Sequence, residues 1–210
     1  LLSPGSDGDG LADTWEESGY DHDGDGTIDV DLPRMGADRN HKDVFVQVDY
    51  MDDQAGHTHR PLSEALDILI RAFANAPVQN PDGQAAIHLH IDTGPDSIMN
   101  PVRSELWGSR SSSRPLAHTN EIGIHDSHGY NWQDFQDIKK PTGFYRGPRE
   151  PIFHYAIFAH DLGGRRSSGV SRNYSGPDFG LGASDFIVSL GPWTDGTGTD
   201  REQAGTLMHE

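Results

Sequence analysis

The sequence contains no cysteine, few basic residues and no long hydrophobic run. The missing cysteine excludes a disulfide framework and thiolate ligands for zinc. Lys and Arg total 16 against 33 Asp and Glu, for a net charge of −17. A nucleic-acid partner is therefore not expected, because binding a phosphate backbone needs a basic face. No apolar stretch reaches the length of a transmembrane helix and no signal peptide is visible, so no membrane span is expected.

Hydrophobic residues make up only 33% of the 210 residues, with 25 Gly and 13 Pro. This composition predicts one domain of ordinary size with long loops and a small appendage. The acid is concentrated in residues 1–31, which hold eight Asp and two Glu without Lys or Arg. Charges so close together repel one another unless a cation gathers them. We therefore divide the chain into an acidic calcium-binding loop segment, residues 1–40, and a globular domain, residues 41–210.

The later half of the acidic segment repeats carboxylates at the spacing of an EF-hand-type loop. From Asp21, carboxylates occupy loop positions 1, 3, 5 and 9, and Gly26 occupies position 6, where such loops turn sharply. Position 7 offers a backbone carbonyl, and position 12 is Leu32, so the acidic residue before it is expected to substitute. The predicted calcium ligands of this second loop are Asp21, Asp23, Asp25, Thr27, Asp29 and Asp31.

The first loop fits the same register with Gly5 at position 1 and Gly10 at position 6. Its predicted ligands, at positions 3, 5, 9 and 12, are Asp7, Asp9, Asp13 and Glu16. A short helix over 11–19, with Trp15 inward and Gly19 at its end, is expected between the loops. Both loops resemble the D-x-D-G-D-G-x-x-D units of thrombospondin type 3 and dockerin-like repeats, which implies bound Ca²⁺ and an extracellular location. The alternative is an acidic, solvated leader without metal.

The globular domain opens with alternating strand and helix signals. Residues 44–50 read as a buried β-branched strand, and apolar residues at helical spacing predict a helix over 61–76. Residues 86–92 read as a second strand, parallel to the first because a helix crosses between them. Further strands are expected at 152–160 and 185–190, whereas 93–150 is expected to be irregular except for a helix at 132–138. The expected fold class is α/β (α+β), a mixed twisted sheet with packed helices.

The chain closes with a capped helix. Thr199 and Glu202 form a capping box, and Ala204, Leu207 and Met208 are expected to form the inner face of the helix, with His209 beside the buried side. The expected order of elements resembles the N-terminal half of a metzincin zinc protease: a sheet, its final strand, a loop and this helix, which ends in His209-Glu210. The segments Phe153–Phe158 and Asp185–Leu190, with the acidic leader, resemble secreted bacterial pappalysin-like members in particular.

The resemblance implies a function for the last two residues. In the family motif H-E-x-x-H-x-x-G-x-x-H, His209 would be the first Zn²⁺ ligand and Glu210 the general base that activates the metal-bound water. The other two histidines have no counterpart in the 210 residues, so we expect the chain by itself to be inactive. The complete protein would be a secreted, calcium-stabilised zinc endopeptidase acting on a protein or peptide substrate.

Two other functions stay open. The chain would be a non-enzymatic calcium-binding adhesion or scaffold module if His209-Glu210 is coincidence, or a glycan-binding domain that uses the 93–150 loops. His88 and His90, at positions i and i+2 of one strand, have a spacing that can bind a metal. With 12 histidines in the chain, most are expected to be surface or hydrogen-bonded core residues.

Overall fold

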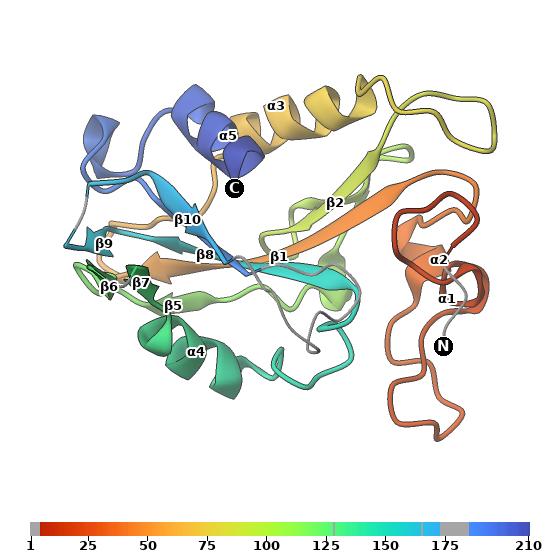
Figure 1. Cartoon of the computed structure of the whole chain (residues 1–210), viewed down its shortest axis with the longest axis horizontal. Coiled ribbons are helices and arrows are strands. Elements are labelled where there is room, and N and C mark those ends of the chain that lie inside the picture. The colour runs from red at the N-terminus through yellow and green to blue at the C-terminus, as the bar shows by residue number, and fades with distance from the viewer. Residues whose placement is uncertain (1–4, 128, 165, 173–184) are drawn as a thin grey trace.

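A computed structural model describes residues 5–127, 129–164, 166–172 and 185–210 (Figure 1). Within them the fold is mixed α/β, with several sheets and five α-helices. The helices are α1 (Asp13–Ser18), α2 (Leu32–Met35), α3 (Ser63–Ala74), α4 (Gln133–Lys139) and α5 (Asp200–His209). The strands are β1 (Asp43–Asp52), β2 (His88–Asp92), β3 (Ile98–Asn100), β4 (Glu105–Leu106), β5 (Pro115–Ala117), β6 (Ile122–Asp126), β7 (Gly129–Asn131), β8 (Phe153–Ala159), β9 (Leu162–Gly163), β10 (Gly169–Ser171) and β11 (Phe186–Ser189).

The main sheet has the strand order β10-β11-β8-β1-β2, and β5 pairs with the end of β1 beyond β2. Strands β2, β5 and β8 all run parallel to β1, and β11 runs parallel to β8. The edge strand β10 is antiparallel to β11. Because the central strands are parallel, their carboxyl ends lie at one end of the sheet, and the loops that follow them meet there.

Each face of the main sheet carries its own core, because successive side chains of a strand point to opposite faces. In β1, Phe45 packs with the cluster on one face and Val46 with the cluster on the other. Helices α3 and α5 cover the second face, as Figure 1 shows, with the buried Leu69 and Ala204 contributing to its core. Helix α4 lies on the opposite side and places Phe135 in the first core.

Most of the predicted elements are confirmed. The strand after residue 43, the helix within 61–76, the parallel strand before Asp92 and the strands near 152–160 and 185–190 all form. The helix at 132–138 is α4, and the helix between the acidic loops is α1, with Trp15 buried and Gly19 as its C-cap. The capping box of α5 forms as predicted, with Thr199 and Glu202 each accepting a backbone N–H bond.

The expectation for residues 93–150 was wrong. Besides α4, this region contains β3 to β7, of which β5 joins the main sheet and β6 and β7 form a small sheet with β9. These strands are two to five residues long. Segments so short show no alternation over several residues, so their pairing depends on tertiary neighbours rather than on local pattern.

The predicted inner face of α5 was also partly wrong. Gln203, Ala204 and Thr206 are buried, whereas Met208 is exposed and the His209 side chain is 83% exposed. Gln203 explains the rotation, because its amide accepts a bond from the Leu62 N–H at 2.8 Å and donates to the Thr197 carbonyl at 3.0 Å. A buried amide with both ends bonded fixes the face of α5 that meets the start of α3.

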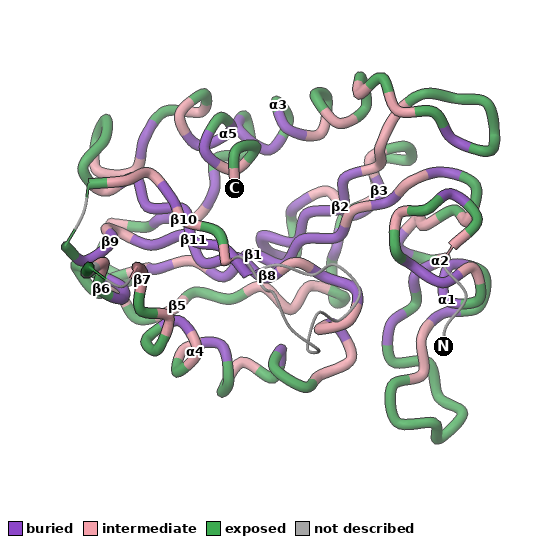
Figure 2. Tube along the Cα trace, in the orientation of Figure 1, coloured by how far each residue is buried: buried purple, intermediate pink, exposed green. Residues whose placement is uncertain are grey.

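The acidic segment packs against the end of the main sheet where β1 begins (Figure 1). Its apolar residues, including Trp15, Leu32 and Met35, belong to the same buried cluster as Phe45 of β1. Figure 2 shows the contrast between this buried side and the exposed loop around residues 21–29. In the described part of the chain, no helix has the length and apolar character needed to cross a membrane.

Candidate metal centres

The first acidic loop brings three of its four predicted ligands together. Carboxylate oxygens of Asp7, Asp9 and Glu16 lie within 4.8 Å of one another. Gly10 has φ +100°, as the sharp turn at loop position 6 requires. Asp13 instead accepts bonds from the backbone and hydroxyl of Ser6, at 2.7 and 2.6 Å. It is not part of the three-carboxylate cluster.

Burial makes this cluster electrostatically unusual. Glu16 is only 3% exposed, and neither of its carboxylate oxygens has a hydrogen-bond partner; one oxygen of the buried Asp7 is also without a partner. Burial, together with the charges of Asp9 and Asp7, raises the pKa of Glu16 to about 9. Burial also raises the pKa of Asp9 to about 6. Buried carboxylates are normally paired or bound to metal, so this convergence fits a cation with oxygen ligands.

The first loop is attached directly to the start of β1. The Lys42 ammonium group donates a hydrogen bond to the Asp7 carbonyl oxygen. The backbone N–H of Asp43, the first residue of β1, donates to the Asp9 carboxylate at 3.0 Å. A cation held by Asp7, Asp9 and Glu16 would therefore order the junction between the acidic segment and the main sheet.

The second loop brings Asp21, Asp23 and Asp29 together, again with carboxylate oxygens within 4.8 Å. Asp21 accepts N–H bonds from Gly24 and Gly26 at 2.8 and 2.9 Å, and Gly26 has the positive φ expected at position 6. In contrast to the first loop, this one is exposed to solvent.

The other predicted ligands of the second loop have local backbone roles. Asp25 accepts a hydrogen bond from the Thr27 N–H at 2.7 Å. Asp31 caps α2 by accepting from the Arg34 N–H at 3.1 Å. Neither Asp25 nor Asp31 belongs to the group of converging carboxylate oxygens.

The predicted zinc residues lie at the end of α5. The Nδ1 atom of His209 is 3.4 Å from the Glu210 carboxylate, and the imidazole projects into solvent. The Glu210 side chain turns back toward the edge strand β10 and lies against Gly169. A Cβ atom added to Gly169 would be 2.7 Å from the Oε1 atom of Glu210. Among the described residues, His209 belongs to no group of three or more converging metal ligands.

The His88 and His90 pair belongs to a buried ion pair. His90 is fully buried and places one ring nitrogen 2.6 Å from the Asp43 carboxylate and the other 2.7 Å from the Met99 carbonyl. Both partners are hydrogen-bond acceptors, so each bond needs a proton on the ring nitrogen that faces it. Burial opposes the charge on Asp43, but hydrogen bonds from His88 and His90 outweigh it and lower the pKa of Asp43. These contacts join β1 to β2, and Asp43, His88 and His90 place one ligand atom each within 4.8 Å of one another, so they form a further group that could hold a metal ion.

Four other histidines form a cluster that the sequence analysis missed. One ring nitrogen from each of His57, His59, His118 and His160 lies within 4.8 Å of the other three. His59 is buried and the other three are half-buried. Their spacing in the sequence does not reveal the cluster, but their place after strands could have done so. These histidines follow β1, β5 and β8, three parallel strands whose carboxyl ends meet.

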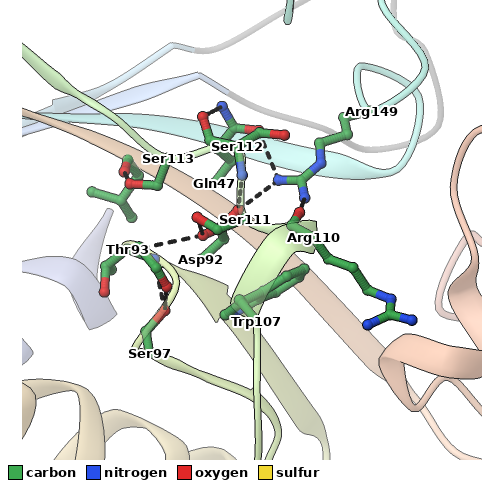
Figure 3. Close-up of polar contacts among 12 residues, drawn as sticks. Gln47, Asp92, Thr93, Ser97, Trp107, Arg110, Ser111, Ser112, Ser113 and Arg149 are labelled. Atoms are coloured by element: carbon green, nitrogen blue, oxygen red, sulfur yellow. Dashed lines mark hydrogen bonds and ion pairs between the residues drawn. The ribbon is translucent and has the colours of Figure 1, made fainter.

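A separate buried network joins the loops of residues 93–150, called the middle loops below, to the main sheet (Figure 3). Asp92, at the end of β2, accepts hydrogen bonds from the Arg149 guanidinium at 2.8 Å and the Ser111 hydroxyl at 2.6 Å. Arg149 also donates to Gln47 at 2.9 Å and lies 4.4 Å from the ring centroid of Phe153. Burial lowers the pKa of Arg149 although Asp92 opposes this. The network is a structural ion pair with its polar atoms bonded.

A pocket of about 380 Å³ opens beside Arg149, between the second acidic loop and the middle loops. Its lining combines acidic Asp29 and Asp31 with basic Arg110 and Arg114.

Comparison with known proteins gives no family for the chain. It matches no protein-family profile, no curated protein and no solved structure. The geometry of these clusters is therefore the basis on which a function can be proposed.

Proposed function

We propose that residues 5–32 bind calcium and that the bound ion stabilises the end of the main sheet where β1 begins. The observation that carries this proposal is Glu16, a buried carboxylate without a hydrogen-bond partner that converges with Asp7 and Asp9. Burial and the neighbouring carboxylates oppose the ionisation of Glu16 and Asp9, and a divalent cation removes this penalty and supplies a partner for the unpaired oxygens. Oxygen-only ligands in a loop with a glycine turn suit calcium.

The two loops should differ in affinity. In the first loop, Asp7 and Glu16 are buried, three of their carboxylate oxygens have no hydrogen-bond partner, and Asp9 is bonded to β1, so less ordering is needed when the ion binds. The second loop is exposed, and none of its carboxylate oxygens is buried without a partner. We expect the first loop to bind calcium more tightly than the second.

Calorimetric titration tests the two sites separately. The parent chain should bind two calcium ions, and Glu16→Gln and Asp23→Asn should each remove one of them. Both substitutions remove one charge and keep the size of the side chain. Heat of binding that is absent in the parent, or unchanged in both variants, would show that the loops are a solvated acidic leader.

A second proposal concerns α5: the chain is the N-terminal part of a secreted zinc endopeptidase of the metzincin type. It is supported by the order of elements, since α5 follows the last sheet strand, β11, and packs beside α3 on one face of the sheet with His209-Glu210 at its end. The described residues do not complete a zinc site there, because His209 is exposed and belongs to no group of three or more converging metal ligands among them. We therefore derive no catalytic step.

The residues encoded after Glu210 decide between this proposal and a calcium-binding adhesion or scaffold module. A continuation with x-x-His-x-x-Gly-x-x-His supports the endopeptidase, and the extended chain should then cleave an unfolded protein in a chelator-sensitive manner. His209→Ala should abolish that cleavage, because a catalytic zinc site needs three protein ligands. An unrelated continuation would favour the non-enzymatic module.

A further inference from the structure

The four-histidine cluster stands at the opposite end of β1 from the acidic segment. His57 and His59 lie on the turn after β1, His118 follows β5, and His160 follows β8. The turn is held by hydrogen bonds from the His57 N–H to Asp53 at 2.9 Å and from the His59 N–H to the Met51 carbonyl at 2.8 Å. The parallel sheet therefore brings together four imidazoles from three separate loops.

The backbone at His160 is equally restricted. The Gly191 N–H donates to the His160 carbonyl at 2.7 Å, and a Cβ atom at position 191 would lie 2.4 Å from that oxygen. A contact below 3.0 Å with backbone cannot be relieved by a side-chain rotation, so glycine is required beside His160. The loop after β11 thus fixes the backbone of His160, from which the fourth imidazole projects.

The distances among three of the four ring nitrogens match a tetrahedral metal site, and the ligand nitrogen of His118 lies within 4.8 Å of them. The Nε2 atoms of His57 and His59 are 3.0 Å apart, and the Nδ1 atom of His160 is 3.3 and 3.1 Å from them. Tetrahedral zinc with Zn–N bonds of about 2.0–2.1 Å places its nitrogens about 3.3 Å apart. In a square-planar site, any three ligands include an opposite pair about 4 Å apart, which these three nitrogens do not.

Protons alone do not account for the three contacts. Each nitrogen of a neutral imidazole carries either a proton or a lone pair, and a hydrogen bond needs one of each. Among three nitrogens in mutual contact, at least two are of the same kind, so at least one contact is repulsive. The Nε2 atom of His118 is also buried and has no hydrogen-bond partner. A shared cation would accept a lone pair from every ring.

We propose that His57, His59, His118 and His160 together bind one divalent transition-metal ion in tetrahedral geometry, with zinc as the preferred ion. Four protein ligands fill a tetrahedral zinc ion, so the site is structural and has no open position for substrate or water. The ion links the loops after β1, β5 and β8. This site is independent of the calcium loops and of His209.

The protonation state of the rings agrees with a metal site. Burial, with the neighbouring His57, His160 and His118, lowers the pKa of His59 to about 3. Burial and the neighbouring His118 and His57 also lower the pKa of His160. Imidazole must be neutral to bind a metal, and both rings are in that form at neutral pH.

Metal content and cobalt spectroscopy test the site in the intact 210-residue chain. With calcium in excess to occupy the acidic loops, the parent should retain one equivalent of zinc after gel filtration. Co²⁺ in its place should give the intense visible absorption of four-coordinate cobalt. His118→Ala should lower zinc affinity by more than about 100-fold, since loss of outer-shell partners alone costs about 10–100-fold.

Matched variants separate this site from others. His57→Ala, on an exposed turn, is a second ligand variant for the case in which His118→Ala fails to fold. It should also lose zinc, and it should keep the circular dichroism spectrum of the parent. His22→Ala and His209→Ala should both keep the full equivalent. Zinc retained by the folded ligand variants, a six-coordinate cobalt spectrum, or no zinc retained by the parent would each overturn the proposal.

Discussion

The Glu16→Gln variant and the parent should differ in stability in opposite directions with and without calcium. The side chain is 3% exposed, both of its oxygens have no hydrogen-bond partner, and Asp7 and Asp9 lie beside it. In excess chelator, the variant should be at least as stable as the parent, because the parent must either bury the charge of Glu16 or take up a proton there on folding, and Gln requires neither. In calcium, the parent should be the more stable of the two, because the variant has lost a ligand.

The size of the effect follows from mass action. Extracellular calcium modules bind with dissociation constants of about 0.1–1 mM, so 10 mM calcium stabilises one site by about 1.4–2.7 kcal/mol. For a chain of this size, that corresponds to a rise in melting temperature of about 3–11 °C. The variant should keep only the smaller gain from the second loop. Urea and thermal unfolding, each in chelator and in 10 mM calcium, measure both quantities.

Glu17→Gln is the matched control, because it makes the same chemical change one residue further along α1. Glu17 is exposed and pairs with Arg39, and a surface ion pair contributes only about 0–1 kcal/mol. Its gain from calcium should equal that of the parent. If Glu16→Gln gained as much stability from calcium as Glu17→Gln, Glu16 would not be a calcium ligand.

Three further predictions concern the main sheet and its helices. In urea unfolding, Leu69→Ala should cost about 2–5 kcal/mol, whereas Ile68→Ala, at a side chain 38% exposed, should cost under about 1 kcal/mol; equal losses would contradict the helix assignment. Burial raises the pKa of Asp49 from 3.8 to about 6, so the folded protein holds a proton on Asp49 that the unfolded chain releases. This proton stabilises the fold by at most about 3 kcal/mol; the contribution is complete below pH 4 and is lost as pH rises through 6. Unfolding titrations of Asp49→Asn between pH 4 and 7 should lack this decline, and a decline equal to the parent's would refute it. Arg149→Met should cost about 3–5 kcal/mol by leaving Asp92 unpaired, and the loss should shrink in an Asp92→Asn background; additive losses would mean that the pair is not coupled.

The sequence predicted the helices and strands of the main sheet correctly where the pattern that encodes them is local. The apolar stripe of α3, the β-branched run of β1 and the capping box of α5 each lie within one short window. The same holds for the first acidic loop, where spacing alone placed Asp7, Asp9 and Glu16 together. Such patterns are reliable because helix and strand periods fix which nearby side chains share a face.

Spacing was insufficient where neighbours compete for the same side chain. Asp13 fits loop position 9, yet it bonds to Ser6 and lies 3.4 Å from Arg39. Met208 fits an apolar face of α5, yet the buried Gln203 sets the rotation of that helix. In both cases a polar contact with a partner distant in the sequence outweighs the local pattern.

By itself, the sequence determined the strand–helix–strand order, the acidic loops and the capped last helix, because each is encoded by residues a few positions apart. Only the tertiary structure decided the four-histidine cluster, whose members come from positions 57, 59, 118 and 160. It also decided that Glu16 is buried without a partner and that Arg149 meets Asp92. These juxtapositions depend on which strands pair and in what order, and strand pairing joins segments whose separation along the chain no local pattern records.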